Sequence, residues 1–281
     1  MLPILGSVAR AARAAGLGSL LGTIRDTVDT AFSQMRTPPL SLRMGEITLH
    51  GFLRHRSFLE SVAEGHGALS RQLFVDSLKP GMVVVDGGAH IGLYSLLASQ
   101  RVGDRGVVIA FEPDPYNYRA LAFNIKENRC RNVVILPKAL SSTVGKQRFY
   151  QHPSTISSSF VDREDLERGR PREVDITALD NELDGLPGDP MLIKLDVEGA
   201  ELLALRGMRN LLGRGMCSVI LLELHPTILR QSGNRPEEVF RELERYRFSM
   251  QMIDEETQTL VPVTSTAALP KANFYCRRGI E

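Results

Sequence analysis

The chain has 281 residues, of which 43% are hydrophobic, and 34 Lys and Arg against 33 Asp and Glu leave a formal net charge of +1. This length and composition predict one α/β domain with an N-terminal extension. The charge balance gives no electrostatic reason to expect nucleic acid as a partner, so none is predicted. The three cysteines, Cys130, Cys217 and Cys276, are scattered and form no CxxC pair, which favours a reducing, cytoplasmic setting.

Residues 1–36 are apolar and rich in Ala and Leu, and Thr37-Pro38-Pro39 ends their helical pattern. Arg10 and Arg13 interrupt the apolar run, so it fits neither a membrane span of about 20 uncharged residues nor a secretory signal, whose positive charge precedes its apolar run. The pattern predicts one or two helices that pack on the domain. The alternative is a helix at a membrane surface, which would make this a cytoplasmic protein with a peripheral membrane contact through residues 1–36.

A rhythm of alternating strands and helices begins at residue 79, so we divide the chain into an extension, 1–78, and an α/β domain, 79–281. The extension contains a predicted strand or hairpin at 41–53 and a predicted helix at 68–78. The rhythm predicts a Rossmann-like, mostly parallel seven-stranded sheet with helices on both faces. The polar stretch 151–190 interrupts it at the end where such folds bind ligands. The predicted strands are 82–85, 107–111, 133–136, 191–195, 217–224, 248–253 and 273–277, and the predicted helices are 90–100, 115–128, 200–208 and 236–246.

The sharpest motif is the run from Asp86 to Gly92, where a buried strand ends in an acid and a glycine-rich turn opens a helix. The dinucleotide fingerprint GxGxxG does not fit, because Ala89 stands at its second glycine. The run fits D-x-G-x-G-x-G, the signature of methyltransferases that bind S-adenosylmethionine, with His90 at the middle glycine. Histidine is enriched at positive φ, so this departure is tolerable. The predicted cofactor contacts in this run are Asp86, Gly87, Gly88, Ala89, His90 and Gly92.

The acid at the end of the first strand also helps to distinguish a dinucleotide cofactor from S-adenosylmethionine. Asp86 would repel a pyrophosphate, but it is favourable beside the cationic methionine end of S-adenosylmethionine. Glu112 ends the next strand, and its carboxylate can pair twice with the two hydroxyls of a ribose. Glu112 and the following Pro113 are therefore predicted to contact the cofactor. The alternative, that the two acids only cap helices, does not explain why both fall at adjacent strand ends beside a glycine-rich turn.

A further cofactor contact is predicted at Ala139, after the third strand. Many class I methyltransferases place an acid here for the adenine amine, and this chain has none. Backbone groups at Ala139 would then have to bind the base. An ordinary exit from the strand is the alternative, and the sequence leaves both open.

A second landmark lies at residues 192–201, where another buried strand ends at Asp196 and three acids fall within six residues. Five elements stand in a fixed order and spacing between Gly81 and His225: VDGGAHIGLYS, AFEPDP followed by Asn124 and Asn128, ITALD at 176–180, LIKLDVEGAELLALRG at 192–207 and LLELHP at 221–226. In these elements the chain resembles the FkbM-type methyltransferases. The resemblance implies a class I methyltransferase fold and usually O-methylation of a hydroxyl on a sugar, glycolipid or natural product.

His225 and Asp196 are the predicted catalytic residues, because both follow buried strands on the ligand side. Methyl transfer needs alignment of donor and acceptor, and an aliphatic hydroxyl benefits from a general base. Histidine titrates near neutrality, so His225 is the expected base, with a structural imidazole before Pro226 as the open alternative. Asp196 would act as base, orient the substrate or assist a metal, and it is also a predicted cofactor contact. No metal-binding spacing such as HExxH occurs, so no metal is predicted.

Two other classes of function remain open at the level of sequence. A nicotinamide-dependent dehydrogenase uses a related fold, but the failed GxGxxG register and Asp86 argue against it. A catalytically silent module that kept the cofactor pocket has no sequence feature against it. We therefore expect an S-adenosylmethionine-dependent O-methyltransferase that acts on a small-molecule or saccharide hydroxyl.

Overall fold

The computed structural model describes residues 40–52, 55–151, 159–161, 170–183, 191–263 and 269–279. The predictions made for residues 1–36 lie outside these described residues. Among the helices within these ranges, none combines the length and the apolar character that crossing a membrane requires.

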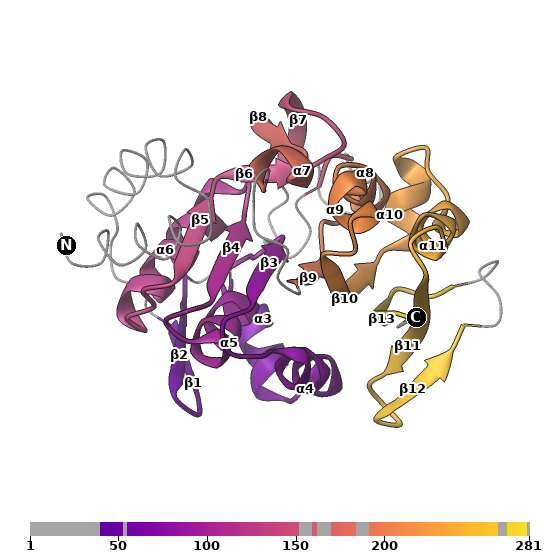
Figure 1. Cartoon of the computed structure of the whole chain (residues 1–281). Coiled ribbons are helices and arrows are strands. Elements are labelled where there is room, and N and C mark those ends of the chain that lie inside the picture. Colours follow the sequence, from indigo (N-terminus) through magenta and orange to yellow (C-terminus); the bar gives the residue numbers. More distant parts are fainter. Residues whose placement is uncertain are drawn as a thin grey trace.

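A central eight-stranded sheet has the order β12-β11-β13-β10-β9-β3-β4-β5 (Figure 1). The strands from β10 to β5 pair in parallel, and β13 runs antiparallel between β10 and β11. The sheet has one strand more than predicted, because the turn at residues 255–258 folds β12 back onto β11 as a hairpin. Its strands are β3 (Val83–Gly87), β4 (Val107–Phe111), β5 (Val133–Leu136), β9 (Met191–Leu195), β10 (Cys217–Leu224), β11 (Phe248–Asp254), β12 (Thr259–Pro262) and β13 (Ala272–Arg278).

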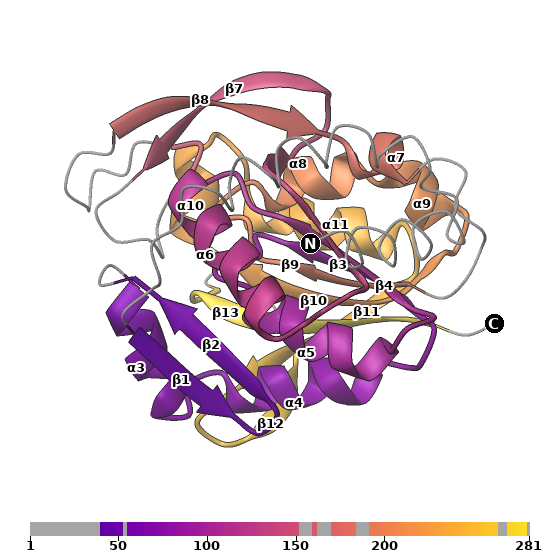
Figure 2. The ribbon, with the colours of Figure 1, turned by 90° about the vertical axis from the view of Figure 1, so that its left-hand side faces the viewer.

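Helices cover both faces of this sheet, as predicted (Figure 2). Alternate residues of β3 enter different cores: Val83 and Val85 pack in one buried cluster and Val84 in the other. The strands are buried on both faces, which explains their continuous apolar runs. One face carries α4 (Ala68–Ser77), α5 (Leu93–Val102) and α6 (Pro115–Glu127); the other carries α8 (Glu201–Arg206), α9 (Arg209–Gly213) and α11 (Pro236–Glu244). The remaining helices are α3 (Arg56–Ala63), α7 (Leu179–Glu182) and α10 (Pro226–Gln231).

The predicted hairpin before the domain is present, with strands β1 (Leu40–Met44) and β2 (Ile47–Gly51). It is fastened to α6 by two asparagines of the family motif. Asn124 accepts a hydrogen bond from the amide of His50, and Asn128 accepts one from the amide of Thr48. The apolar residues of β2 lie in the same core as Val84. The described part of the extension thus shares its core with the α/β domain.

A second, three-stranded sheet lies between β5 and β9 along the chain, and one of its strands, β8, falls within the polar stretch 151–190. It consists of β6 (Lys138–Leu140), β7 (Gly145–Gln151) and β8 (Arg170–Thr177), in the order β6-β8-β7. Its small core contains Ala139, Phe149 and Ile176. Figure 1 shows this sheet above the central one, at the end toward which β3, β4 and β5 point. It therefore lies on the side of the molecule where parallel strands end.

Candidate active site

A cavity of about 320 Å³ opens at the carboxyl ends of β3, β4, β9 and β10. This is the edge where doubly wound sheets bind ligands, and the volume lies at the lower end of the range for small-molecule sites. Its wall combines aromatic rings with charged side chains. Its lining includes the aromatic residues Phe58, Tyr94, Phe111, Phe149 and Phe160, and the charged residues Arg71, Glu112, Lys138, Lys194, Asp196, Glu198 and Glu223, together with His66 and His90.

The glycine-rich turn after β3 brings its backbone against the end of β9. Gly88 has φ +75°, and a Cβ added to it would lie 1.8 Å from the carbonyl oxygen of Asp196. His90 and Gly92 also have positive φ, +53° and +97°, so the helix α5 begins at Leu93 rather than at His90. The left-handed conformation expected for His90 is confirmed. Only a residue without a side chain fits at Gly88, and the backbone there borders the cavity.

Glu112 joins the glycine-rich turn to the end of β4. Its carboxylate accepts hydrogen bonds from the amides of His90, at 2.7 Å, and Asp114, at 2.9 Å. Burial, reinforced by the neighbouring Asp114, raises the pKa of the Glu112 carboxyl to about 8 against these hydrogen bonds. Asp114 itself caps α6 by accepting from the amides of Tyr116 and Asn117. Glu112 thus presents a buried carboxyl group on the cavity wall.

Asp86 lies behind this wall rather than on it. Its side chain is fully buried, and its Oδ2 accepts a 2.6 Å hydrogen bond from Ser95 Oγ. Its other oxygen is 3.8 Å from Lys194 Nζ. The ammonium group of Lys194 reaches the cavity, donates to the carbonyl of Gly88 at 3.0 Å and lies 3.2 Å from Asp196 Oδ2. Asp86 therefore contributes to the site through Lys194.

The Lys194 ammonium stays charged although it is buried. Burial alone would lower its pKa, but the carboxylates of Asp196 and Asp86 outweigh that effect and hold the pKa above its ordinary value. Lys194 also lies over the ring of Tyr94, 5.2 Å from its centroid. It is a fixed positive charge between the glycine-rich turn and the acids that follow β9.

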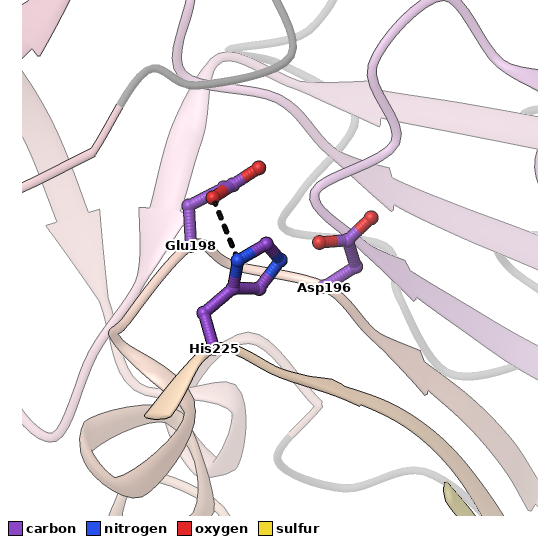
Figure 3. Close-up of side chains that lie close together, drawn as sticks. All are labelled: Asp196, Glu198 and His225. Atoms are coloured by element: carbon purple, nitrogen blue, oxygen red, sulfur yellow. Dashed lines mark ion pairs between the residues drawn. The ribbon is translucent and has the colours of Figure 1, made fainter. Parts of the chain in front are cut away.

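An ion-pair network follows the ends of β9 and β10, and Figure 3 shows its pair of His225 with Glu198. His225 Nδ1 lies 3.5 Å from Glu198 Oε2, and His225 Nε2 lies 3.1 Å from Glu223 Oε1. Lys271 Nζ approaches the same Glu223 oxygen at 2.8 Å. Burial alone would raise the pKa of the Glu223 carboxyl, but His225 and Lys271 hold it well below its usual range. Burial raises the pKa of Glu198 to about 8, although His225 opposes the shift.

The imidazole of His225 is held between these two carboxylates. Burial alone would lower its pKa, but the pairing with Glu223 and Glu198 raises it overall. Asp196, Glu198 and Glu223 line the cavity, whereas His225 is not among the lining residues. The two predicted catalytic residues are therefore brought to one place, with Asp196 on the wall and His225 behind Glu198 and Glu223.

Most of the residues predicted from the sequence converge on the cavity. Among the lining residues are Gly88, Ala89, His90, Glu112, Pro113, Ala139 and Asp196; Asp86, Gly87, Gly92 and His225 are not. Sequence reasoning missed the roles of Lys194, Glu198 and Glu223. All three stand inside quoted motifs, so a signal was present. Phe58 in α3 and Arg71 in α4 lie outside those motifs, so the sequence did not point to them.

A doubly wound sheet with a glycine-rich turn and strand-end acids around a cavity is the arrangement of Rossmann-like domains. The family model described as the methyltransferase FkbM domain matches residues 86–250. This is more than half of the chain, and the chain belongs to that methyltransferase family. The expected class I methyltransferase fold is thereby confirmed.

Two relatives are methyltransferases by name. The chain is 27% identical over 183 residues to the hexuronic acid methyltransferase AglP of Haloferax volcanii, covering 64% of this chain and 69% of that protein. It is 28% identical over 174 residues to the methyltransferase sdnD of Sordaria araneosa, covering 49% and 67%. A putative methyltransferase from Streptococcus mutans, solved in complex with SAH, is similar with a TM-score of 0.45, 9% identity and coverage of 75% and 96%.

Proposed function

We propose that the protein is an S-adenosylmethionine-dependent O-methyltransferase that acts on a hydroxyl of a sugar, glycolipid or natural product. The observation that carries this proposal is the meeting of Gly88, Glu112 and Asp196 at one cavity. These residues come from the ends of three neighbouring parallel strands, and each suits a different part of the reaction. Membership of the methyltransferase FkbM domain family supports the reaction class.

The residues on the cavity wall fit the cofactor. Gly88 borders the cavity, and a ligand can approach the backbone of a glycine closely. The Glu112 carboxylate can accept from two ribose hydroxyls, and the backbone at Ala139 would contact the adenine. S-adenosylmethionine supplies an activated methyl group when bound. The chain's own task is then to align that methyl group with an acceptor oxygen.

Asp196 and His225 are proposed to act on the acceptor side. Asp196 lines the cavity and can accept a hydrogen bond from a hydroxyl group, which orients the acceptor oxygen. His225 acts on the acceptor through its two carboxylate neighbours, since both of its ring nitrogens face them. The acids that surround it suit an acceptor that donates hydrogen bonds, as a hydroxyl does.

An acidic saccharide is the acceptor that we favour. His66 and Arg71 lie on the wall of the cavity, and the Arg71 guanidinium donates to the carbonyl of His66. A guanidinium suits a carboxylate, and the relative AglP is named for a hexuronic acid. The wall thus offers acids for a hydroxyl and a cation for an acidic substituent.

A turnover assay with purified full-length protein tests this proposal. S-adenosylhomocysteine release is followed over a library of hydroxyl compounds that pairs uronic acids with the matching neutral sugars. Methyl transfer to an oxygen, with a preference for the acidic member of a pair, supports the proposal. Transfer to nitrogen, or S-adenosylmethionine binding without turnover on any hydroxyl in the library, would contradict it.

A further inference from the structure

Three potential metal ligands converge beside the cavity: the carboxylates of Asp196 and Glu198 and the imidazole of His225 (Figure 3). One ligand atom from each residue can be chosen so that all three atoms lie within 4.8 Å of one another. Asp196 and Glu198 also line the cavity. A cation held by these groups would face the space in which the methyl acceptor is proposed to bind.

The imidazole of His225 is oriented by a carboxylate on its far side. Its Nε2 lies 3.1 Å from Glu223 Oε1, and Lys271 Nζ lies 2.8 Å from the same oxygen. Glu223 accepts from both groups, so Nε2 carries a proton and Nδ1 is directed to Glu198. Metal-binding histidines almost always donate their second ring nitrogen in this way, and the partner fixes the tautomer.

Glu198 provides a second, independent observation. Its Oε2 is buried and has no hydrogen-bond partner among the described residues. The atom lies 3.5 Å from His225 Nδ1, a distance at which the two groups attract only if a proton or a cation is present. A buried carboxylate oxygen without a donor is costly, and a bound cation would satisfy it.

The local charge favours a divalent cation over a proton on His225. Four carboxylates are linked by the ion pairs of this region, and two ammonium groups, those of Lys194 and Lys271, oppose them. With all four carboxylates ionised and the imidazole neutral, two negative charges remain. A divalent cation would cancel both, whereas a proton on the imidazole would cancel one. The four carboxylates are those of Asp86, Asp196, Glu198 and Glu223.

We propose that Asp196, Glu198 and His225 Nδ1 bind one divalent cation of the Mg²⁺ or Mn²⁺ class, and that this cation holds the acceptor hydroxyl. Carboxylate oxygens suit these hard ions, and Mn²⁺ also accepts an imidazole ligand. His225 is then a ligand rather than the general base. This replaces the sequence-based expectation that no metal is required.

The cation would make the acceptor oxygen a better nucleophile. As a Lewis acid, the cation would lower the pKa of a bound hydroxyl. The hydroxyl would then release its proton to water at the cavity mouth. A lone pair of that oxygen forms the new C–O bond, and the electrons of the S–CH₃ bond remain on sulfur, so sulfonium and alkoxide become thioether and ether. The role of the cation in catalysis rests on the proposed function, but cation binding itself does not.

Mn²⁺ binding to the full-length protein tests the site. The protein is stripped with a chelator and titrated with Mn²⁺, and free Mn²⁺ is followed by electron paramagnetic resonance. We expect one Mn²⁺ per chain, bound about tenfold or more weakly by Glu198→Gln and by His225→Gln. Glu60→Gln is the matched control, because the exposed Glu60 carboxylate pairs with Arg56 on α3. Circular dichroism melts establish that each variant is folded.

The possible outcomes distinguish cation binding at this site from the proposed methyl transfer. No Mn²⁺ binding by the stripped protein, or equal binding by Glu198→Gln and the parent, would overturn the site. Mn²⁺ binding without any methyl transfer would support the site and overturn the proposed function. Methyl transfer that a chelator abolishes and Mn²⁺ or Mg²⁺ restores would support both, while transfer unaffected by the chelator would overturn the catalytic role of the cation.

Discussion

The backbone amide of His90 donates a 2.7 Å hydrogen bond to Glu112 Oε2, which ties the glycine-rich turn after β3 to the end of β4. Glu112 also accepts from the amide of Asp114 at the first turn of α6. The residue proposed to bind the ribose therefore also holds two backbone segments in place. A substitution that tests its role in binding must keep an acceptor for those amides.

Glu112→Gln should weaken S-adenosylhomocysteine binding while the fold persists. Glutamine keeps one acceptor oxygen for the backbone but loses the charge that strengthens hydrogen bonds from hydroxyls. The expected loss is about 1.5–3 kcal/mol, or roughly 10- to 150-fold in affinity. Isothermal calorimetry measures it. The exposed residue Glu127 at the end of α6 provides the control Glu127→Gln, and equal affinities of the two variants would remove Glu112 from the site.

Cofactor binding should release a proton from Glu112 below its pKa of about 8. In the empty protein the carboxyl is mostly protonated at neutral pH, because burial has raised its pKa from the ordinary 4.5. Two ribose hydroxyls favour the ionised form and lower that pKa again, so affinity rises with pH up to about 8 and then levels off. Calorimetry at neutral pH in buffers of different ionisation enthalpy should give about one proton released per ligand.

The control for this proton release is the same measurement above pH 9, where Glu112 is already ionised and little release is expected. Glu112→Gln should bind the ligand without releasing the proton that the Glu112 carboxyl releases in the parent, at any pH. A parent protein that binds ligand with no proton exchange at neutral pH would contradict the assignment of the ribose contact to Glu112.

Gly88→Ala should disrupt the site, because its Cβ would lie 1.8 Å from the carbonyl oxygen of Asp196 and Gly88 has a positive φ. Either β3 and β9 move apart or the turn changes conformation, at a cost of about 3 kcal/mol or more. The control is Gly213→Ala in α9, where the nearest atom to the new Cβ is Tyr246 Cε1 at 4.0 Å. Thermal unfolding should show a large loss for Gly88→Ala alone, and equal melting temperatures would be inconsistent with this packing.

The central sheet was predictable because its strands are buried on both faces, and such strands appear as continuous apolar runs like Val83–Val85. The strands β6, β7 and β8 were missed because they pack over a small core and carry polar residues on their outer face. The glycine-rich turn was predictable because its residues follow one another along the chain, and those from Gly88 to His90 line the cavity. The proposed cation ligands Asp196 and His225 follow two different strands, so no local spacing reveals them.

Asp196→Asn and His225→Ala should both slow methyl transfer by about 10²-fold or more, since each removes a group that acts at the acceptor oxygen. S-adenosylhomocysteine affinity should change little in His225→Ala, because His225 lies behind Glu198 and Glu223. Asp196→Asn has a further effect, since Asp196 pairs with Lys194 on the cofactor side. Steady-state turnover with one identified acceptor measures the loss of rate in each variant. Near-normal turnover in both variants would show that alignment alone suffices.

Removal of residues 1–36 should leave S-adenosylhomocysteine affinity unchanged, because this segment precedes the first βα unit and contributes no residue to the motif from Asp86 to Gly92. We propose that this segment contacts a membrane surface, on account of Arg10, Arg13 and Arg25 within its apolar sequence. Flotation with anionic vesicles should therefore recover the full chain and lose the truncated one. Equal flotation of the two proteins would reject the membrane contact, and a loss of affinity on truncation would place the segment near the cofactor.

The central claim, that the cavity binds S-adenosylmethionine, is tested most directly by calorimetry of the full-length protein with S-adenosylhomocysteine and, separately, with NAD. The glycine-rich turn at Gly88, the carboxylate of Glu112 and the acid-held Lys194 line one cavity that suits the first ligand. We expect S-adenosylhomocysteine to bind with a stoichiometry of one and NAD to give no heat of binding. Binding of NAD with no response to S-adenosylhomocysteine would contradict the account.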